Sequence, residues 1–170
     1  MRHTIGVVME NKPGVLSRIS ALLARRGFNI DSITAGPTRD QDVTRMTVVL
    51  EGDDYVADQA AKEIHKLEDI IRIERFELAH TTRREIMLIK VRATKDERSE
   101  IVDLAKIMNC DIVDISESTL MLEHSDTPEK IDLLVRLLSS YEILDMARGG
   151  AIALNKGEEE EYIFKLPKKD

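Results

Sequence analysis

The sequence predicts an α+β fold of two βαββαβ units, with two helices covering one face of each antiparallel sheet. Three observations predict it. Strand-like alternation and helix-like spacing of apolar residues occur in the same order twice along the 170 residues. Hydrophobic residues make up 42% and aromatic residues only 4%, which is typical of a globular chain with an aliphatic core. A polar stretch, residues 79–84, separates the two apolar sets.

The first unit is expected within residues 1–78. Residues 3–9 alternate apolar with small or polar side chains, as a half-buried strand does, and a turn with Pro and Gly follows. From Val15 to Leu23 the apolar residues have helical spacing, and Gly27 lies where a helix should end. These residues predict a strand, a tight turn and an amphipathic helix.

The first unit continues with an extended segment at 28–37 and a strand at 44–50, which together predict a hairpin. Asp53 or Asp54 can cap the next helix. A strand that starts at Asp69 completes the split, ferredoxin-like pattern. The inward residues expected in the second helix and the last strand are Val56, Ala60, Ile64, Leu67, Ile71 and Ile73.

The second unit, expected at 84–154, repeats this order. Its elements are a strand at 86–92, a helix at 95–108, a hairpin of 111–116 and 119–123, a helix that begins at Pro128 and a strand at 143–148. The remaining residues, 155–170, begin with the like-charge run Glu158–Glu161 and are expected to form a flexible acidic tail. The alternative is that this tail docks on a partner.

The charge and composition exclude several kinds of partner. A formal net charge of −7 argues against nucleic acid, because contacts to phosphate need a basic surface. The sequence contains no apolar run that approaches about 18 residues, so neither a membrane span nor a signal peptide is expected. Cys110 is the only cysteine, so no internal disulfide can form and a cytoplasmic location is expected.

We find no pattern that predicts catalysis or a metal site in this chain. Cys110 has no activating base nearby in the sequence and is expected to be a small buried residue. No nucleophile, phosphate-binding or dinucleotide-binding motif occurs. The histidines lie on different predicted elements without metal-ligand spacing: His3, His65, His80 and His124.

The turn after the first strand is the most informative segment. The first N–H groups of a helix have no internal partners and attract a carboxylate. Pro13, in the turn before the helix, fixes φ where its missing N–H donor costs little, and Gly14 lacks the Cβ that would obstruct a ligand. Asn11 can both donate and accept hydrogen bonds, which suits an amino acid. An ordinary N-terminal turn uses the same residue types, so these residues alone leave both interpretations open.

The equivalent turn of the second unit differs. It reads Ala93-Thr94-Lys95-Asp96-Glu97, without glycine and with acidic residues where a ligand carboxylate would arrive. We therefore expect that only the first unit binds such a ligand.

At this point the sequence resembles the ACT domain, a βαββαβ module that senses amino acids. More closely, it is similar to the small regulatory subunits of acetolactate synthase, also called acetohydroxyacid synthase. The resemblance covers residues 1 to about 154. The matching segments are Glu10–Arg18, Arg26–Thr34, Thr44–Thr47, His65–Leu67 and Arg84–Val91.

The resemblance implies a homodimer with valine, leucine or isoleucine bound between two first units. One subunit would contribute Asn11, Pro13, Gly14, Val15 and Leu16, and its mate would contribute Asn29 and Ile30. A ligand bound only in one quaternary arrangement can bias that arrangement. Asn29 has an alternative interpretation, as a residue at the start of a strand that bonds its own turn.

The resemblance also implies a partner, the catalytic large subunit, which small subunits of this family activate and make sensitive to valine. The cofactors thiamine diphosphate, FAD and magnesium belong to that large subunit, and none is expected in this chain. Gly36 stands where the family often has alanine, beside the implied ligand. The rival interpretation is a stand-alone ACT-type sensor that controls another enzyme or regulator.

Overall fold

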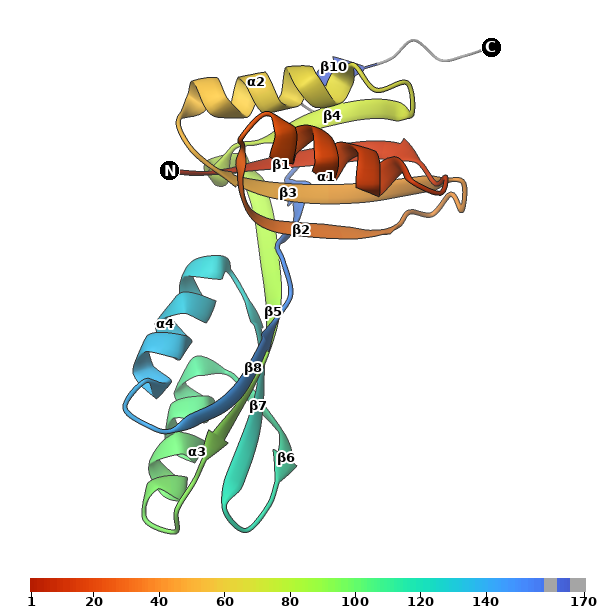
Figure 1. The fold of residues 1–170 in the computed structure, drawn as a ribbon. Helices are drawn as coiled ribbons and strands as arrows, with labels where there is room; N and C mark the ends of the chain where they lie inside the picture. Colours follow the sequence, from red (N-terminus) through yellow and green to blue (C-terminus); the bar gives the residue numbers. More distant parts are fainter. Residues whose placement is uncertain (158–161, 166–170) are drawn as a thin grey trace. The chain divides into compact units, whose positions relative to one another are not determined.

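A computed structural model describes residues 1–157 and, for the backbone alone, residues 162–165. It contains two compact units, one of residues 1–82 together with the chain from Gly150, and one of residues 83–149. Both have the predicted α+β architecture (Figure 1). The division differs from the predicted 1–78 and 84–154 chiefly at residues 150–154, which pack with the first unit.

The first unit is a sheet with two helices on one face. Its strands run in the order β10-β4-β1-β3-β2, all antiparallel to their neighbours, so β2 is an outer strand. The elements are β1 (Arg2–Glu10), α1 (Val15–Arg25), β2 (Asn29–Pro37), β3 (Val43–Glu51), α2 (Asp54–His65), β4 (Ile70–Phe76) and β10 (Tyr162–Lys165).

The first helix ends at the predicted glycine. Gly27 has φ +73°, a left-handed conformation that side chains with a Cβ rarely adopt. The Gly27 N–H donates to the Ala24 carbonyl and the Phe28 N–H donates to the Leu23 carbonyl. These two bonds form a Schellman motif, which satisfies carbonyls that the helix leaves free and turns the chain into β2.

The last strand of the first unit differs from the prediction. Ile70 and Ile73 are buried in the core, and Ile71 is only partly buried, so the expected inward position of Ile71 was wrong. The pairing of β1 with β4 shifts after Val8, and Met9 lies opposite Ile70. A one-residue shift of this kind exchanges the two faces of a strand.

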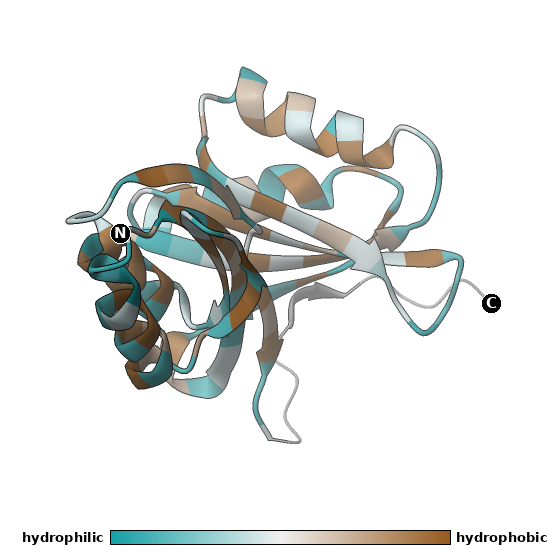
Figure 2. Cartoon of the chain, turned by 90° about the horizontal axis from the view of Figure 1, so that it is seen from below, coloured by the Kyte–Doolittle hydropathy of each residue, from teal (hydrophilic) through white to brown (hydrophobic). Residues whose placement is uncertain are grey.

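The second helix of the first unit shows a smaller difference. Ala60 and Ile64 are fully buried as expected, whereas Val56 and Leu67 are only partly buried. Ala57 and Ala61 join the core in their place. The helices visible in Figure 2 have alternating hydrophobic and hydrophilic segments along their length, which fits one buried and one exposed side.

The outer face of the first sheet, away from the helices, is covered by a short strand, β9 (Ile152–Asn155). Arg45 Nη2 on β3 donates to the Ala153 carbonyl at 3.5 Å. A Cβ on Gly150 would lie 2.4 Å from Thr34 Oγ1 on β2, so this approach requires glycine. The chain that follows the second unit therefore covers the outer face of the first unit's sheet.

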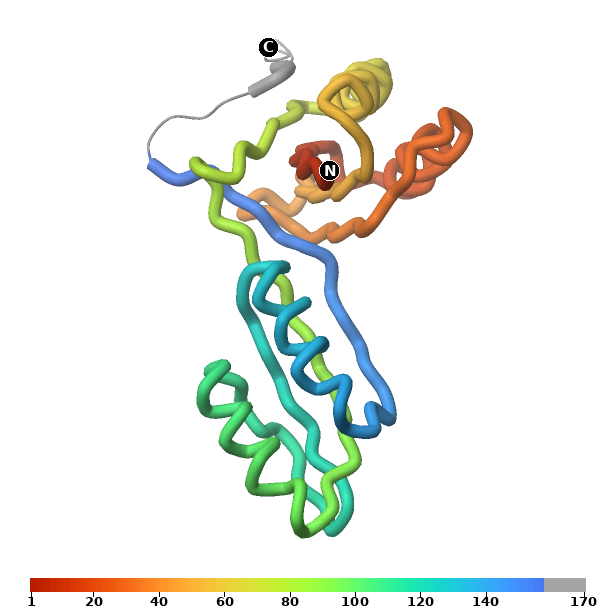
Figure 3. The backbone as a smooth tube through the Cα atoms, turned by 90° about the vertical axis from the view of Figure 1, so that its left-hand side faces the viewer, coloured from red at the N-terminus to blue at the C-terminus, as the bar shows by residue number. Residues whose placement is uncertain are grey.

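The second unit repeats the fold with the strand order β6-β7-β5-β8, and both of its helices lie on one side of the sheet (Figure 3). Pro128 begins its last helix, as predicted. The elements are β5 (Thr81–Arg92), α3 (Glu97–Met108), β6 (Asp111–Ile115), β7 (Thr119–Asp126), α4 (Pro128–Leu138) and β8 (Ile143–Arg148).

The two polar segments have more structure than the sequence predicts. Residues 79–84, the expected linker, lie in the 3-10 helix η1 (Leu78–His80) and in the first residues of β5. Within the expected tail, β10 pairs with β4, in keeping with the strand preference of its Tyr-Ile-Phe sequence. The charge run at 158–161 lies outside the described residues.

Candidate functional site

The candidate site begins at the turn between β1 and α1. Gly14 is the N-cap of α1 and has φ +86° and ψ −9°, which is left-handed. Any residue with a Cβ is strained there, so this backbone conformation explains the glycine. Pro13 precedes the N-cap, within the predicted turn, and the helix begins at Val15.

Asn11 is held in place by the loop between β2 and β3. Its backbone N–H donates to the Asp42 carbonyl at 2.7 Å, and its Nδ2 donates to the Gln41 carbonyl at 2.9 Å. With the amide nitrogen bonded in this way, Oδ1 of the exposed Asn11 is left to accept a hydrogen bond from a ligand.

The start of α1 has several unsatisfied donors. No side chain caps the helix. The Val15 N–H donates to the Lys12 carbonyl over a long 3.4 Å, whereas no hydrogen bond within the described residues engages the N–H groups of Gly14, Leu16 and Ser17. Of the backbone groups that the resemblance implies, Gly14 and Leu16 are thus free to bind, and Val15 is weakly occupied. Free N–H groups at a helix start favour a carboxylate.

Two cations beside the turn are already paired with acids. Lys12 Nζ lies 2.6 Å from Glu10 Oε2, and the hydrogen bond that Lys12 donates to this carboxylate raises the pKa of Lys12. Arg18 on α1 pairs with Asp69. A Cβ placed on Gly14 would lie 3.6 Å from Arg18 Nη1, so this guanidinium borders the turn. Net attraction for an anion must therefore come mainly from the backbone N–H groups.

Asn29 and Ile30 open β2. Asn29 Nδ2 donates to Glu51 Oε2 on β3 at 2.7 Å, which leaves its Oδ1 available. Ile30 lies opposite Leu50 and packs partly against the first core. The contacts of Glu51, Gln41 and Arg18 with the candidate site were not predicted from the sequence. The spacing of Arg18, four residues after Gly14 on one helix, is a signal that could have found it. The contacts of Glu51 and Gln41 could be predicted only from the pairing of β2 with β3 and the position of the loop between them.

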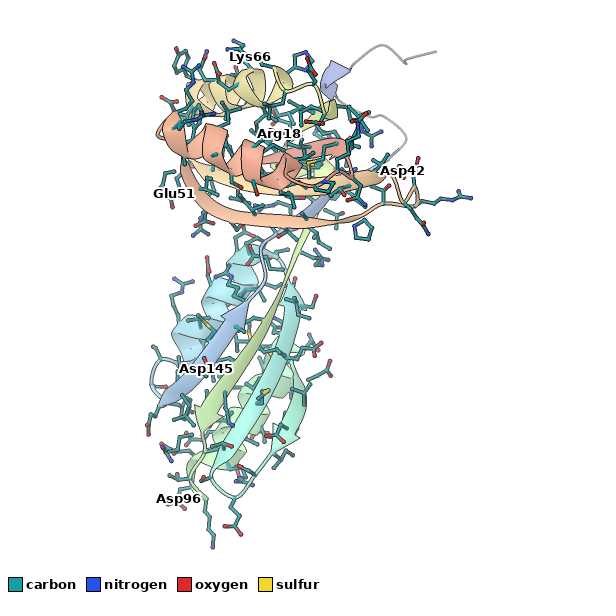
Figure 4. All side chains as sticks on the ribbon, turned by 45° about the vertical axis from the view of Figure 1, so that its right-hand side comes forward. Arg18, Asp42, Glu51, Lys66, Asp96 and Asp145 are labelled. Atoms are coloured by element: carbon teal, nitrogen blue, oxygen red, sulfur yellow. The ribbon has the colours of Figure 1, made fainter. Side chains whose placement is uncertain are left out.

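The two groups of predicted ligand-binding residues lie at opposite ends of the same sheet. Asn11 follows Glu10, which pairs with Val43 at the start of β3, whereas Asn29 pairs with Glu51 at its end. Figure 4 shows Asp42 and Glu51 at these two ends. Eight residue steps along a strand separate them, about 26 Å. Within one chain, the structure does not bring Asn29 and Ile30 together with the Gly14 turn.

The free edge of β2 lies between these two ends. β2 pairs only with β3 among the described residues, and its outward N–H and C=O groups are available to another strand. Ile33 points to the helix side of the sheet, opposite the buried Val48, yet it remains 36% exposed. Leu16 at the start of α1 is also exposed. An unprotected edge with exposed apolar side chains is typical of an association surface.

The equivalent turn of the second unit is closed by its own side chains. Glu97 Oε2 accepts from the Thr94 hydroxyl at 2.6 Å and from the Thr94 N–H at 3.2 Å, and the Glu97 N–H donates to Thr94 Oγ1 at 3.4 Å. This reciprocal pattern is a capping box. It lowers the pKa of Glu97, chiefly through the hydroxyl bond.

Three other features bear on function: the single cysteine, clusters of metal-ligating side chains and helices that could span a membrane. Burial, with a smaller effect of the Asp111 charge, raises the pKa of the Cys110 thiol to about 11, so the thiol is protonated near neutral pH. Among residues 1–157 and 162–165, no group of three or more His, Cys, Asp or Glu side chains could hold a metal ion. No helix in the described part of the chain is long and apolar enough to cross a membrane.

The fold and the glycine turn define an ACT-domain protein, and comparison with family models agrees. The model of the AHAS small subunit-like ACT domain matches residues 5–72, and the model of the small subunit of acetolactate synthase matches residues 84–157. Individual relatives and a solved structure identify the family within this class.

The chain is 41% identical over 157 residues to a probable acetolactate synthase small subunit of Archaeoglobus fulgidus, with 92% of this chain and 98% of the relative covered. It is 39% identical over 155 residues to the acetolactate synthase small subunit of Mycolicibacterium smegmatis, with 91% of each covered. The crystal structure of the acetolactate synthase small subunit from Thermotoga maritima matches with a TM-score of 0.86 at 30% identity, with 94% of this chain and 99% of that chain covered. The chain belongs to the acetolactate synthase small-subunit family, which confirms the resemblance.

Proposed function

We propose that this chain is a non-catalytic regulatory subunit of acetolactate synthase in branched-chain amino-acid biosynthesis. It acts in the cytoplasm, activates the catalytic large subunit, and makes that subunit sensitive to feedback inhibition by valine or a related amino acid. The large subunit holds the thiamine diphosphate, FAD and magnesium. Membership of the small-subunit family supports the assignment to a two-component enzyme.

The observation that carries the proposal is the separation of the two half-sites along β2. In a homodimer whose β2 strands pair antiparallel, a two-fold axis reverses the mate's strand. The Asn29 end of the mate then lies beside the Pro37 end of the first chain, next to its Asn11 turn. Two equivalent sites result, each with one half from each chain.

The chemistry of the half-sites fits a zwitterionic amino acid. The free N–H groups of Gly14, Leu16 and Ser17 can hold its carboxylate. The Oδ1 atoms of Asn11 and of the mate's Asn29 can accept from its ammonium, because each amide nitrogen is already bonded within its own chain. The exposed Leu16 and Ile33 side chains offer apolar surface to an aliphatic side chain.

Binding across a two-fold axis provides a route to regulation. Because the complete site exists only in one arrangement of the dimer, the ligand stabilises that arrangement by its full binding free energy. By linkage, a large subunit that prefers another arrangement lowers the affinity for valine, and valine lowers its affinity or activity.

A mixed dimer tests the proposal most sharply. We would combine one chain with Asn11→Ala and one with Asn29→Ala, purify the heterodimer with two tags, and titrate it with valine by calorimetry. Such a heterodimer has one site with both substitutions and one site with neither. We expect about one valine per dimer at wild-type affinity, whereas each parental homodimer should bind at least about tenfold more weakly.

The outcome that contradicts a shared site is a heterodimer that binds no better than its parents. Circular dichroism of all three dimers checks that the folds are intact. Titration of the wild-type dimer with leucine and isoleucine ranks the effectors, and a wild-type dimer that binds none of the three amino acids would overturn the proposed function itself.

A further inference from the structure

The outer faces of the two sheets differ although the folds repeat. On the first sheet, the outward-facing Thr47 and Val49 are only 3% and 4% exposed, because the chain from Gly150 covers this side. On the second sheet, Ile86 and Leu88 of β5 face outward and are 49% and 39% exposed. No other described segment of the second unit covers them.

We call the second surface the open face. The pairing of β5 with β7 and β8 places Leu88 opposite Glu123 and Ala147, and Lys90 opposite Met121 and Asp145. Ile86, Leu88, Met121 and Ala147 lie on neighbouring strands of this face, with Lys90 and Glu123 beside them. A folded protein seldom exposes a cluster of apolar side chains in this way unless it binds something.

The open face carries more carboxylates than unpaired cations. Four carboxylates lie on this side of the sheet: Asp111 and Asp114 of β6, Glu123 of β7 and Asp145 of β8. Two cations of this face, Lys90 and Arg84, have no ion pair in the described structure, whereas Arg92 is paired with Glu142 at 2.6 Å. Charge complementarity therefore calls for a partner with basic residues among apolar ones.

We propose that the open face of the second sheet is the surface that docks on the catalytic large subunit, through a patch of apolar residues interspersed with lysine or arginine. The inference rests on the proposed function for the existence of that partner. It adds which side of which unit makes the contact and what chemistry the partner must present.

A second copy of this chain fits the open face less well. Face-to-face pairing of two copies would bring the carboxylates of both faces together, in excess of their unpaired cations, and like charges across an interface are unfavourable.

The test compares two leucines of nearly equal exposure. Leu88 lies on the open face, and Leu133 lies on the exposed side of α4 and is 38% exposed. We would measure the affinity of each full-length lysine variant for the purified large subunit by biolayer interferometry. Leu88→Lys should weaken association at least about tenfold, since it adds positive charge to an apolar contact, and Leu133→Lys should leave it within about twofold.

The electrostatic part has its own measurement. The wild-type affinity for the large subunit should fall as salt rises, and Glu123→Gln should make that dependence shallower. Equal effects of Leu88→Lys and Leu133→Lys, or no salt dependence, would overturn the proposal. So would a change in the mass of the chain alone on Leu88→Lys, measured by sedimentation, because it would identify a second copy as the occupant.

Valine titration separates this inference from the proposed function. Leu88→Lys should bind valine as the wild type does, because the open face belongs to the second unit. If the wild type binds valine and the large subunit but Leu88→Lys changes neither, only the docking face is wrong. If the wild type does not associate with the large subunit, both proposals fail.

Discussion

The turns that start α1 and α3 occupy the same position in two repeated units, and they treat the helix start in opposite ways. At α3 the Glu97 carboxylate bonds the Thr94 hydroxyl and N–H, so the chain supplies its own anion. At α1 Gly14 adopts a left-handed conformation and no side chain caps the helix. A helix start becomes a binding site only where the chain leaves its donors free.

A parallel contrast exists on the outer faces of the two sheets. The first sheet lies under β9, and the second has exposed apolar side chains on β5. The first unit thus has an uncapped helix start and a covered outer sheet face. The second unit has a capped helix start and an exposed outer sheet face. The two proposals assign effector binding to the first unit and partner docking to the second, and the following changes test this contrast.

The largest effect is expected from a charge at the open helix start. Gly14→Asp should weaken valine binding at least about 100-fold, because the new carboxylate repels that of the ligand. Gly14→Asn is the matched control, since it has the same left-handed backbone strain without the charge and should lose less than about tenfold. Calorimetry with both variants measures the difference, and equal losses would mean that strain alone disrupts the turn.

The covered outer face should be sensitive to added volume. A Cβ on Gly6 would lie 2.7 Å from the Phe76 ring, so Gly6→Val should cost about 1–3 kcal/mol of unfolding free energy. At the equivalent exposed place on the second sheet, Leu88→Lys should change stability by less than about 0.5 kcal/mol. Urea unfolding checks both, and similar values for the two would contradict the contrast between the faces.

A smaller, stabilising effect is expected on β2. A Cβ on Gly36 meets no atom within 4 Å, so Gly36→Ala should stabilise the chain by about 0.4–1 kcal/mol through a less flexible unfolded state. Gly150→Ala, with a contact of 2.4 Å to Thr34, should destabilise it. Thermal unfolding distinguishes the two, and destabilisation by Gly36→Ala would show that β2 needs glycine for another reason.

The smallest effect concerns acid stability at the capped turn. Hydrogen bonds from Thr94 lower the pKa of folded Glu97, so the carboxylate stabilises the fold above the unfolded pKa of about 4.3. This contribution is lost as pH falls through the folded pKa. Glu97→Gln should lower the melting temperature slightly at pH 7 and not at pH 3. An equal change at both values would exclude a role for the charge.

Much of this architecture follows from local sequence. The alternation around Ile5 to Met9, the helical spacing from Val15 and the glycine after α1 act through neighbours in the chain, so their prediction holds in the structure. The prediction for Ile71 was wrong because the sequence of a single strand does not reveal the shift in strand pairing after Val8. The pairing of β10 with β4 was not predicted, because the run of glutamates before β10 is typical of an exposed tail.

For the candidate site, the residue types around Gly14 already indicated free donors, and their chemistry could be inferred without coordinates. By itself the sequence determined the two repeated units, the glycine turn and the contrast between Gly14 and Glu97, since each depends on residues close together in the chain. Only the tertiary structure decided that Asn29 lies a strand length away from Asn11, that Glu51 holds it, and that one sheet is covered and the other open. These features depend on strand order and register, which arise from contacts between residues far apart in sequence.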